Sequence, residues 1–88
     1  MVESYRLEDI GDGDAYISIE ENEEDRNNIF VETTAMKTYE RHIKDVINRE
    51  LQKYNVNGLN VYAYDNGALD FVFKNRLYNE LVNGGYII

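Results

Sequence analysis

A regular spacing of apolar residues in the middle of the chain constrains its fold more than any other sequence feature. Apolar residues recur there every three or four positions, at Met36, Tyr39, Ile43, Val46, Ile47, Leu51 and Tyr54. This period places them on one face of an α-helix. We expect Thr33 or Thr34 to cap the helix by accepting a hydrogen bond from an unpaired backbone amide. The helix should end at residues 55–58, where Asn or Gly can adopt the left-handed conformation.

Alternation of apolar and polar residues predicts strands on both sides of this helix. Residues 14–20 (DAYISIE) and 59–65 (LNVYAYD) alternate in this way, as half-buried strands do, and residues 29–33 (IFVET) form a shorter candidate strand. The polar run at residues 21–28 separates the first strand from the second, so we expect these two to pair as an antiparallel hairpin with a long turn. A second helix is expected from Ala68 to about Val82, followed by a short strand or a frayed tail at residues 86–88.

The order β-β-α-β-α, with room for a short C-terminal strand, predicts an α+β fold. We expect a two-layer sandwich in which a mainly antiparallel sheet carries both helices on one face. No internal repeat or linker divides residues 1–88, so the chain should form a single domain with a mobile arm at residues 1–9. The helix-facing side chains should be Ala15, Ile17, Ile19, Ile29, Val31, Leu59, Val61 and Ala63.

The opposite face of the predicted sheet collects aromatic side chains. They are Tyr16, Phe30, Tyr62 and Tyr64. Amphipathic rings of this kind on a small domain are typical of a surface that binds a partner. Two other interpretations stay open: a terminal segment folds over the rings, or the rings simply stack across strands.

Composition and charge exclude several classes of function. The 88 residues include 17 acidic and 9 basic side chains, for a net charge of -8, so the chain should repel a phosphate backbone and bind no nucleic acid. The absence of cysteine excludes disulfides, thiolate metal sites and thiol nucleophiles, as is typical of a reducing compartment. The N-terminal sequence lacks the features of a secretory signal, and no apolar run reaches membrane-spanning length, so we expect a cytoplasmic protein that does not enter membranes.

The acidic run DIGDGDAYISI, residues 9–19, is the first candidate for a site. In an EF-hand loop the sixth position is a glycine, but counting from Asp9 or from Asp12 puts Asp14 or Ile17 there. A weak calcium site formed by the three aspartates stays an alternative to carboxylates that bond nearby backbone amides. We expect the second arrangement, without a metal.

Histidine chemistry and known catalytic motifs give no candidate for an active site. His42, the only histidine, lies within the first predicted helix beside its apolar stripe, and the sequence offers it neither an orienting partner nor a concave site. We therefore expect a surface histidine. The chain also lacks a nucleophile elbow, a phosphate-binding loop and zinc-ligand spacing, which indicates a non-catalytic protein.

The sequence from residue 54 to residue 81 carries a motif in its turn and second helix. Its residues are Asp65, Gly67, Ala68, Leu69 and Asp70, followed by Lys74, Asn75 and Arg76. This stretch resembles the acyl carrier subunit, or gamma chain, of citrate lyase, in which a D-x-G-A-L-[DE] turn opens a helix with an R-A-R run. The upstream sequence TTAMKTYERHIKDVI is similar to the S-S-V-x-x-Q-F helix start of that family, and the resemblance extends from about residue 10 to residue 82.

The resemblance also implies an attachment site. In the family, a serine in an L-E-S-[SG]-D turn carries a phosphoribosyl-dephospho-coenzyme A arm through a phosphodiester. The alignment of GDGDAYISI with this turn puts Asp12 on the serine and Gly13 and Asp14 on the last two turn residues. Gly11 and Gly13 would keep the turn compact and exposed. A phosphodiester requires a hydroxyl group, whereas a carboxylate would form an acyl phosphate, which hydrolyses readily.

Two functions follow from the resemblance. The first is that of a non-catalytic subunit of a multisubunit lyase or decarboxylase, which presents a thioester arm derived from phosphoribosyl-dephospho-coenzyme A to larger catalytic subunits. The alternative is an unmodified carrier-like protein, with no cofactor, that serves as an interaction or assembly subunit, because Asp12 replaces the serine and the only serines of the chain are Ser4 and Ser18. We expect Lys74, Arg76 and the aromatic side of the sheet to contact the partner. Self-association stays open.

Overall fold

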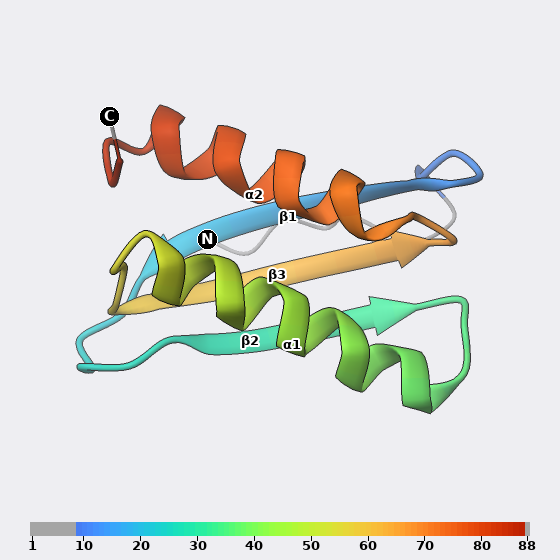
Figure 1. Ribbon diagram of the computed structural model, residues 1–88, viewed down its shortest axis with the longest axis horizontal. Helices are drawn as coiled ribbons and strands as arrows, with labels where there is room; N and C mark the ends of the chain where they lie inside the picture. Colours follow the sequence, from blue (N-terminus) through green and yellow to red (C-terminus); the bar gives the residue numbers. More distant parts are fainter. Residues whose placement is uncertain (1–8, 88) are drawn as a thin grey trace.

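The computed structural model describes residues 9–87, which form three strands and two helices (Figure 1). In chain order the elements are β1 (Asp14–Glu21), β2 (Asn28–Thr33), α1 (Lys37–Lys53), β3 (Leu59–Asn66) and α2 (Asp70–Asn83). The two helices lie side by side over one face of the sheet, α1 against β2 and α2 against β1. The predicted α+β class, with both helices in one layer, is confirmed.

The strand order is β1-β3-β2, so the last strand in sequence lies in the middle of the sheet. β1 runs antiparallel to β3, and β2 runs parallel to it. The predicted hairpin between β1 and β2 is therefore wrong, and the sheet is mixed, with its antiparallel part in the β1–β3 pair. The loop between β1 and β2 crosses the start of β3, where the Asn27 side chain donates to the Val56 carbonyl at 2.8 Å and accepts from the Leu59 amide at 3.0 Å.

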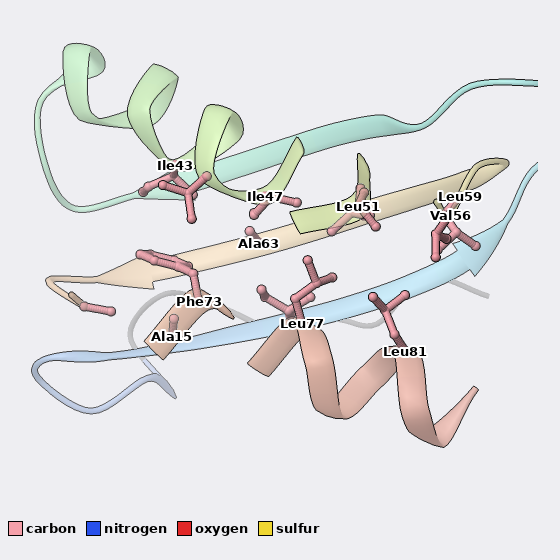
Figure 2. Packing of buried hydrophobic residues seen from close by; sticks show 14 residues of the cluster. Ala15, Ile43, Ile47, Leu51, Val56, Leu59, Ala63, Phe73, Leu77 and Leu81 are labelled. Atoms are coloured by element: carbon pink, nitrogen blue, oxygen red, sulfur yellow. The ribbon is translucent and has the colours of Figure 1, made fainter. Parts of the chain in front are cut away.

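The core lies between the sheet and the two helices. Figure 2 shows side chains from both helices pointing toward the sheet; those that are fully or almost fully buried are Ile43, Ile47 and Leu51 of α1 and Phe73, Leu77 and Leu81 of α2. All eight predicted helix-facing strand residues are buried in this core or packed against it. Burial of each large apolar side chain contributes roughly 1.5–3 kcal/mol.

The helix ends differ in part from the sequence prediction. Met36 occupies the N-cap of α1 and makes no side-chain cap hydrogen bond, so the predicted threonine cap is wrong. The Thr33 hydroxyl instead accepts from the Ala35 amide and donates to Asp65. Asn55 follows α1 with a φ of 57°, the left-handed conformation expected there.

The C-terminal part of the described chain contains no further strand. α2 begins at Asp70, two residues later than predicted, and Tyr86 and Ile87 pack against the core without joining the sheet. Ile88 and all but Asp9 of the predicted arm lie outside the described residues. Within residues 9–87, neither helix has the length and apolar character needed to cross a lipid bilayer.

Candidate functional site

The acidic run at the start of β1 forms a tight turn. The Asp14 amide donates to the Gly11 carbonyl at 3.1 Å, which closes a four-residue turn. Gly13, the third residue, has a φ of 77°, as a type II turn requires at this position. Asp12 is the second residue, and it is exposed at the tip of the turn.

Asn66, the last residue of β3, holds this turn in place on both sides. Its side-chain amide donates to the Ile10 carbonyl at 2.8 Å, and its own carbonyl accepts from the Gly13 amide at 2.7 Å. The Thr34 hydroxyl donates to Asn66 Oδ1 at 3.3 Å. Sequence analysis missed this residue, because Asn66 is the unspecified position of the D-x-G-A-L-[DE] motif and contacts a segment more than fifty residues earlier.

Arg76 links the same turn to α2. Its guanidinium donates to Asp14 Oδ1 at 2.7 Å and to the Ala15 carbonyl at 3.3 Å. The hydrogen bond from Arg76, followed by that from the Ala15 amide, holds the pKa of the Asp14 carboxyl below its usual range. Arg76, expected from sequence to bind a partner, thus has a contact within the chain, whereas Lys74 is exposed.

Asp65 joins the ends of two strands to the segment that leads into α2. It is fully buried, and its carboxylate accepts hydrogen bonds from the Thr33 hydroxyl at 2.6 Å and from the Ala68 amide at 2.8 Å. Gly67, two residues later, has a φ of 83° and forms an isolated backbone β-bridge with Asp14. Residues of the D-x-G-A-L-[DE] motif therefore hold the backbone beside the acidic turn, and two of them, Asn66 and Gly67, contact the turn directly.

His42 lies on the surface between the two helices. Its Nε2 is 2.9 and 3.0 Å from the two carboxylate oxygens of Asp70, and its ring stacks on Tyr39 with centroids 5.5 Å apart. The structure thus supplies a partner that the sequence did not reveal. The side chain is 44% exposed, in agreement with the predicted surface histidine. Tyr39 donates to the Ala68 carbonyl, and burial, with the charges of Asp65 and Asp70, raises its pKa.

Four aromatic residues on the sheet face opposite the helices, here called the aromatic face, form two cross-strand pairs. The rings of Phe30 and Tyr62 stack with centroids 5.1 Å apart, and those of Tyr16 and Tyr64 lie 6.1 Å apart in a tilted arrangement. Phe30 is 49% exposed and lines a hollow of about 430 Å³ with both Tyr62 and Tyr64. Stacking across strands is thus present, and partner binding by this face stays a prediction.

The Tyr62 hydroxyl is anchored at the edge of the aromatic face. It donates to a carboxylate oxygen of Glu20 at 2.7 Å, and this hydrogen bond raises the pKa of Tyr62 and lowers that of Glu20. A second hydrogen bond, from the Asn60 side chain, also lowers the pKa of Glu20. The ring of Tyr62 is therefore held in a fixed orientation.

The acidic residues of the turn do not assemble a metal site among residues 9–87. This part of the chain contains no group of three or more His, Cys, Asp or Glu side chains that could hold an ion. Asp14 already pairs with Arg76. The alternative calcium site therefore receives no support.

The side chain at the tip of the turn does not suit the attachment of the prosthetic group that the resemblance implies. A phosphodiester requires a hydroxyl, and Asp12 presents a carboxylate there. Ser18 lies in the middle of β1, opposite Tyr62 in the register, and is only partly exposed. Ser4 lies outside the described residues. The residues of the turn thus do not fit the group.

The mixed sheet, its single layer of two helices and the exposed turn before β1 define a small α+β module that presents a loop at one end of the sheet. Comparison with protein families identifies the particular family. The chain belongs to the family described as "ACP: Malonate decarboxylase delta subunit (MdcD)", which matches residues 9–81. Comparisons with curated proteins and with solved structures give no significant match.

The family assignment confirms the acyl carrier part of the sequence prediction. It names malonate decarboxylase, where the sequence resemblance pointed to citrate lyase. Carrier families of this kind hold a prosthetic group on a serine and serve as non-catalytic subunits beside larger enzyme subunits. The sequence resemblance aligned Asp12 with that serine, and this assignment stays a prediction.

Proposed function

We propose that this chain is a subunit of a malonate-decarboxylase-type complex in the cytoplasm and that it binds the larger catalytic subunits without a covalent arm at position 12. The observation that carries the proposal is the carboxylate of Asp12 at the tip of an otherwise complete turn. The family match supports the type of complex.

The way the turn is held supports a role in presentation to a partner. The positive φ of Gly13, the hydrogen bonds of Asn66 and the ion pair of Arg76 fix a backbone whose tip is exposed. Loops that a rigid scaffold positions in this way are common sites of binding. In this setting the Asp12 carboxylate gives the tip a negative charge, which resembles the phosphate of a loaded serine.

The loaded carrier remains the second candidate, because the family and the preserved turn both favour it. In that case phosphoribosyl-dephospho-coenzyme A, or a related group, would have to be attached to a hydroxyl elsewhere in the chain. Ser4 and Ser18 are the only serines. Citrate-lyase-type chemistry, in which the arm carries a thioester between catalytic subunits, belongs to this candidate.

Intact-mass spectrometry of the protein purified from its native host separates the two candidates. We expect the mass of the unmodified chain, together with co-purification of the larger decarboxylase subunits. A coenzyme-sized adduct that peptide mapping places on Ser4 or Ser18 would overturn the proposal. Asp12→Ser serves as the matched variant: it should gain the adduct at position 12 when produced with the host's prosthetic-group transferase, because only the hydroxyl is missing.

We further propose that the aromatic face contacts the larger subunits, as its exposed ring and hollow suggest. Replacement of both Tyr62 and Tyr64 by serine should leave the monomer folded but abolish co-purification. A variant pair that still co-purifies would remove this face from the proposal.

A further inference from the structure

α2 carries apolar side chains on two opposite sides. One side faces the core. The other side consists of residues 71, 78 and 82, whose spacing of seven and four positions places them on a single stripe. These outward residues are Phe71, 66% exposed, Tyr78, 40% exposed, and Val82, 38% exposed. A helix with apolar residues on both sides is typical of one that is covered on both sides.

α1 shows that the outer stripe of α2 is not a general property of the helical layer. The outward positions of α1 are exposed and polar or charged; they include Lys37, Arg41, Asp45, Asn48 and Gln52. Both helices pack on the same sheet, yet residues 37–53 of α1 leave no large apolar side chain exposed, and only its N-cap residue Met36 does so. The Tyr78 ring lies 6.0 Å from that of Tyr54, between centroids, so the fold of residues 9–87 accounts for part of the stripe but leaves Phe71 and Val82 exposed.

The N-terminal end of α2 exposes another apolar residue, two positions after a glycine that pairs with the acidic turn. Leu69, the N-cap residue of α2, is 65% exposed and makes no side-chain cap hydrogen bond, although Ser, Thr, Asp or Asn is usually preferred at this position. Gly67, two residues earlier, forms an isolated backbone β-bridge with Asp14 of the turn. A molecule that covers α2 would thus also reach the tip of the turn.

The charge on this side of α2 indicates what kind of molecule covers it. Lys74 is exposed, lies between Phe71 and Tyr78 in the helix, and forms no ion pair with any residue from 9 to 87. A complementary surface therefore needs an acidic group. A second copy of this chain is disfavoured, because the net charge of -8 on each copy opposes association.

We propose that the outer face of α2, formed by Leu69, Phe71, Lys74, Tyr78 and Val82, docks into an apolar groove of a larger subunit that places a carboxylate beside Lys74. This is recognition of an amphipathic helix by a groove, with anchors at helical spacing. The inference rests on the proposed function, since it names the surface that the catalytic subunits bind. A subunit docked on this face would also contact the acidic turn that contains Asp12, so it would bind the turn and the helix at the same time.

Calorimetric titration with the host's recombinant malonate decarboxylase subunits tests the proposal. Phe71→Ser should weaken binding about tenfold or more, as truncation of a central aromatic anchor commonly does. Lys74→Glu should weaken it as well, because it places two negative charges opposite each other. Met36→Ser and Lys37→Glu are matched controls, since they change an exposed apolar residue and an exposed lysine near the start of α1. Both controls should bind as the unmodified chain does.

The outcomes separate this inference from the proposed function. If the unmodified chain binds none of the subunits, the proposed function fails and the docking surface fails with it. If the unmodified chain and the Phe71→Ser and Lys74→Glu variants bind equally well, the docking surface is wrong and the proposed function stands. Light scattering of the free chain supplies a third outcome: a dimer that Phe71→Ser converts to a monomer would make a second copy the occupant and overturn the inference. Thermal melts establish that each variant is folded, which is expected because the replaced side chains are exposed.

Discussion

The Arg76 guanidinium donates a 2.7 Å hydrogen bond to Asp14 Oδ1 and so connects α2 to the first residue of β1. The bond lowers the pKa of Asp14 in the folded state. A carboxyl group with a lowered folded-state pKa stabilises the fold at pH values above its unfolded pKa, and this contribution is lost as the pH falls through the folded pKa.

Arg76→Gln should therefore unfold at a lower urea concentration than the unmodified chain at neutral pH. The difference should shrink as the pH falls through the acidic range in which Asp14 is protonated, and the part that remains reports the lost bond to the Ala15 carbonyl. Urea titrations at several pH values measure this. Arg49→Gln, which removes an exposed pair with Asp45 in α1, is the control and should have little effect. A pH-independent difference would show that the ion pair does not stabilise the fold.

Gly13→Ala should destabilise the protein by about 1–2 kcal/mol, the usual cost of a left-handed conformation for a residue with a Cβ. Nothing lies within 4 Å of an added Cβ at Gly13, so the cost is that of the backbone alone. Gly11→Ala is a close control, since its Cβ would also be in open space and its φ is not positive. Equal stability of the two variants, measured by urea unfolding, would contradict the turn geometry.

Asp65→Ala should be the most damaging polar substitution near the turn. It leaves the buried Ala68 amide without its acceptor, at about 1–3 kcal/mol, and it also removes the acceptor of the half-buried Thr33 hydroxyl. Thr34→Val removes a 3.3 Å hydrogen bond of an exposed hydroxyl and should cost much less. Thermal unfolding of both variants provides the comparison. A mild effect of Asp65→Ala would mean that water replaces the carboxylate.

Glu20→Ala should lower the pKa of Tyr62 toward that of a free tyrosine, because the hydrogen bond from the tyrosine hydroxyl to Glu20 is the first cause of its raised pKa. A titration of the Tyr62 ring followed by NMR measures the change. Glu23→Ala, in the exposed loop after β1, is the control. An unchanged Tyr62 pKa in Glu20→Ala would indicate that burial of the ring, rather than the hydrogen bond, sets the value.

The helices, the strands and the two faces of the sheet could be predicted because each depends on a regular spacing of apolar residues within one segment. The spacing of Ile43, Ile47 and Leu51 sufficed for α1, and alternation sufficed to put Val61 inside and Tyr62 outside. Strand pairing could not be predicted in the same way, since nothing in the pattern of β2 specifies its neighbour. The pairing depends on a loop whose side chains bond to the start of β3.

The candidate site, too, could be predicted only where it depends on residues that are neighbours in the sequence. The positions of Asp12 and Gly13 in a turn follow from neighbouring residues, and the sequence indicated both. The contacts of Asn66 and Arg76 with that turn span 56 and 62 residues, so only the assembled fold brings them together. The outer stripe of α2 could be distinguished from core residues only once the buried side of the helix was known.

The central place of β3 has a consequence for biosynthesis. Within residues 9–87, neither β1 nor β2 has a hydrogen-bonded neighbouring strand until residues 59–66 are available, because both pair only with β3. A nascent chain that has not yet reached residue 59 thus contains two strands with unsatisfied edges, and such edges favour aggregation. The described sheet can form only after β3 has been synthesised and released for pairing with both earlier strands.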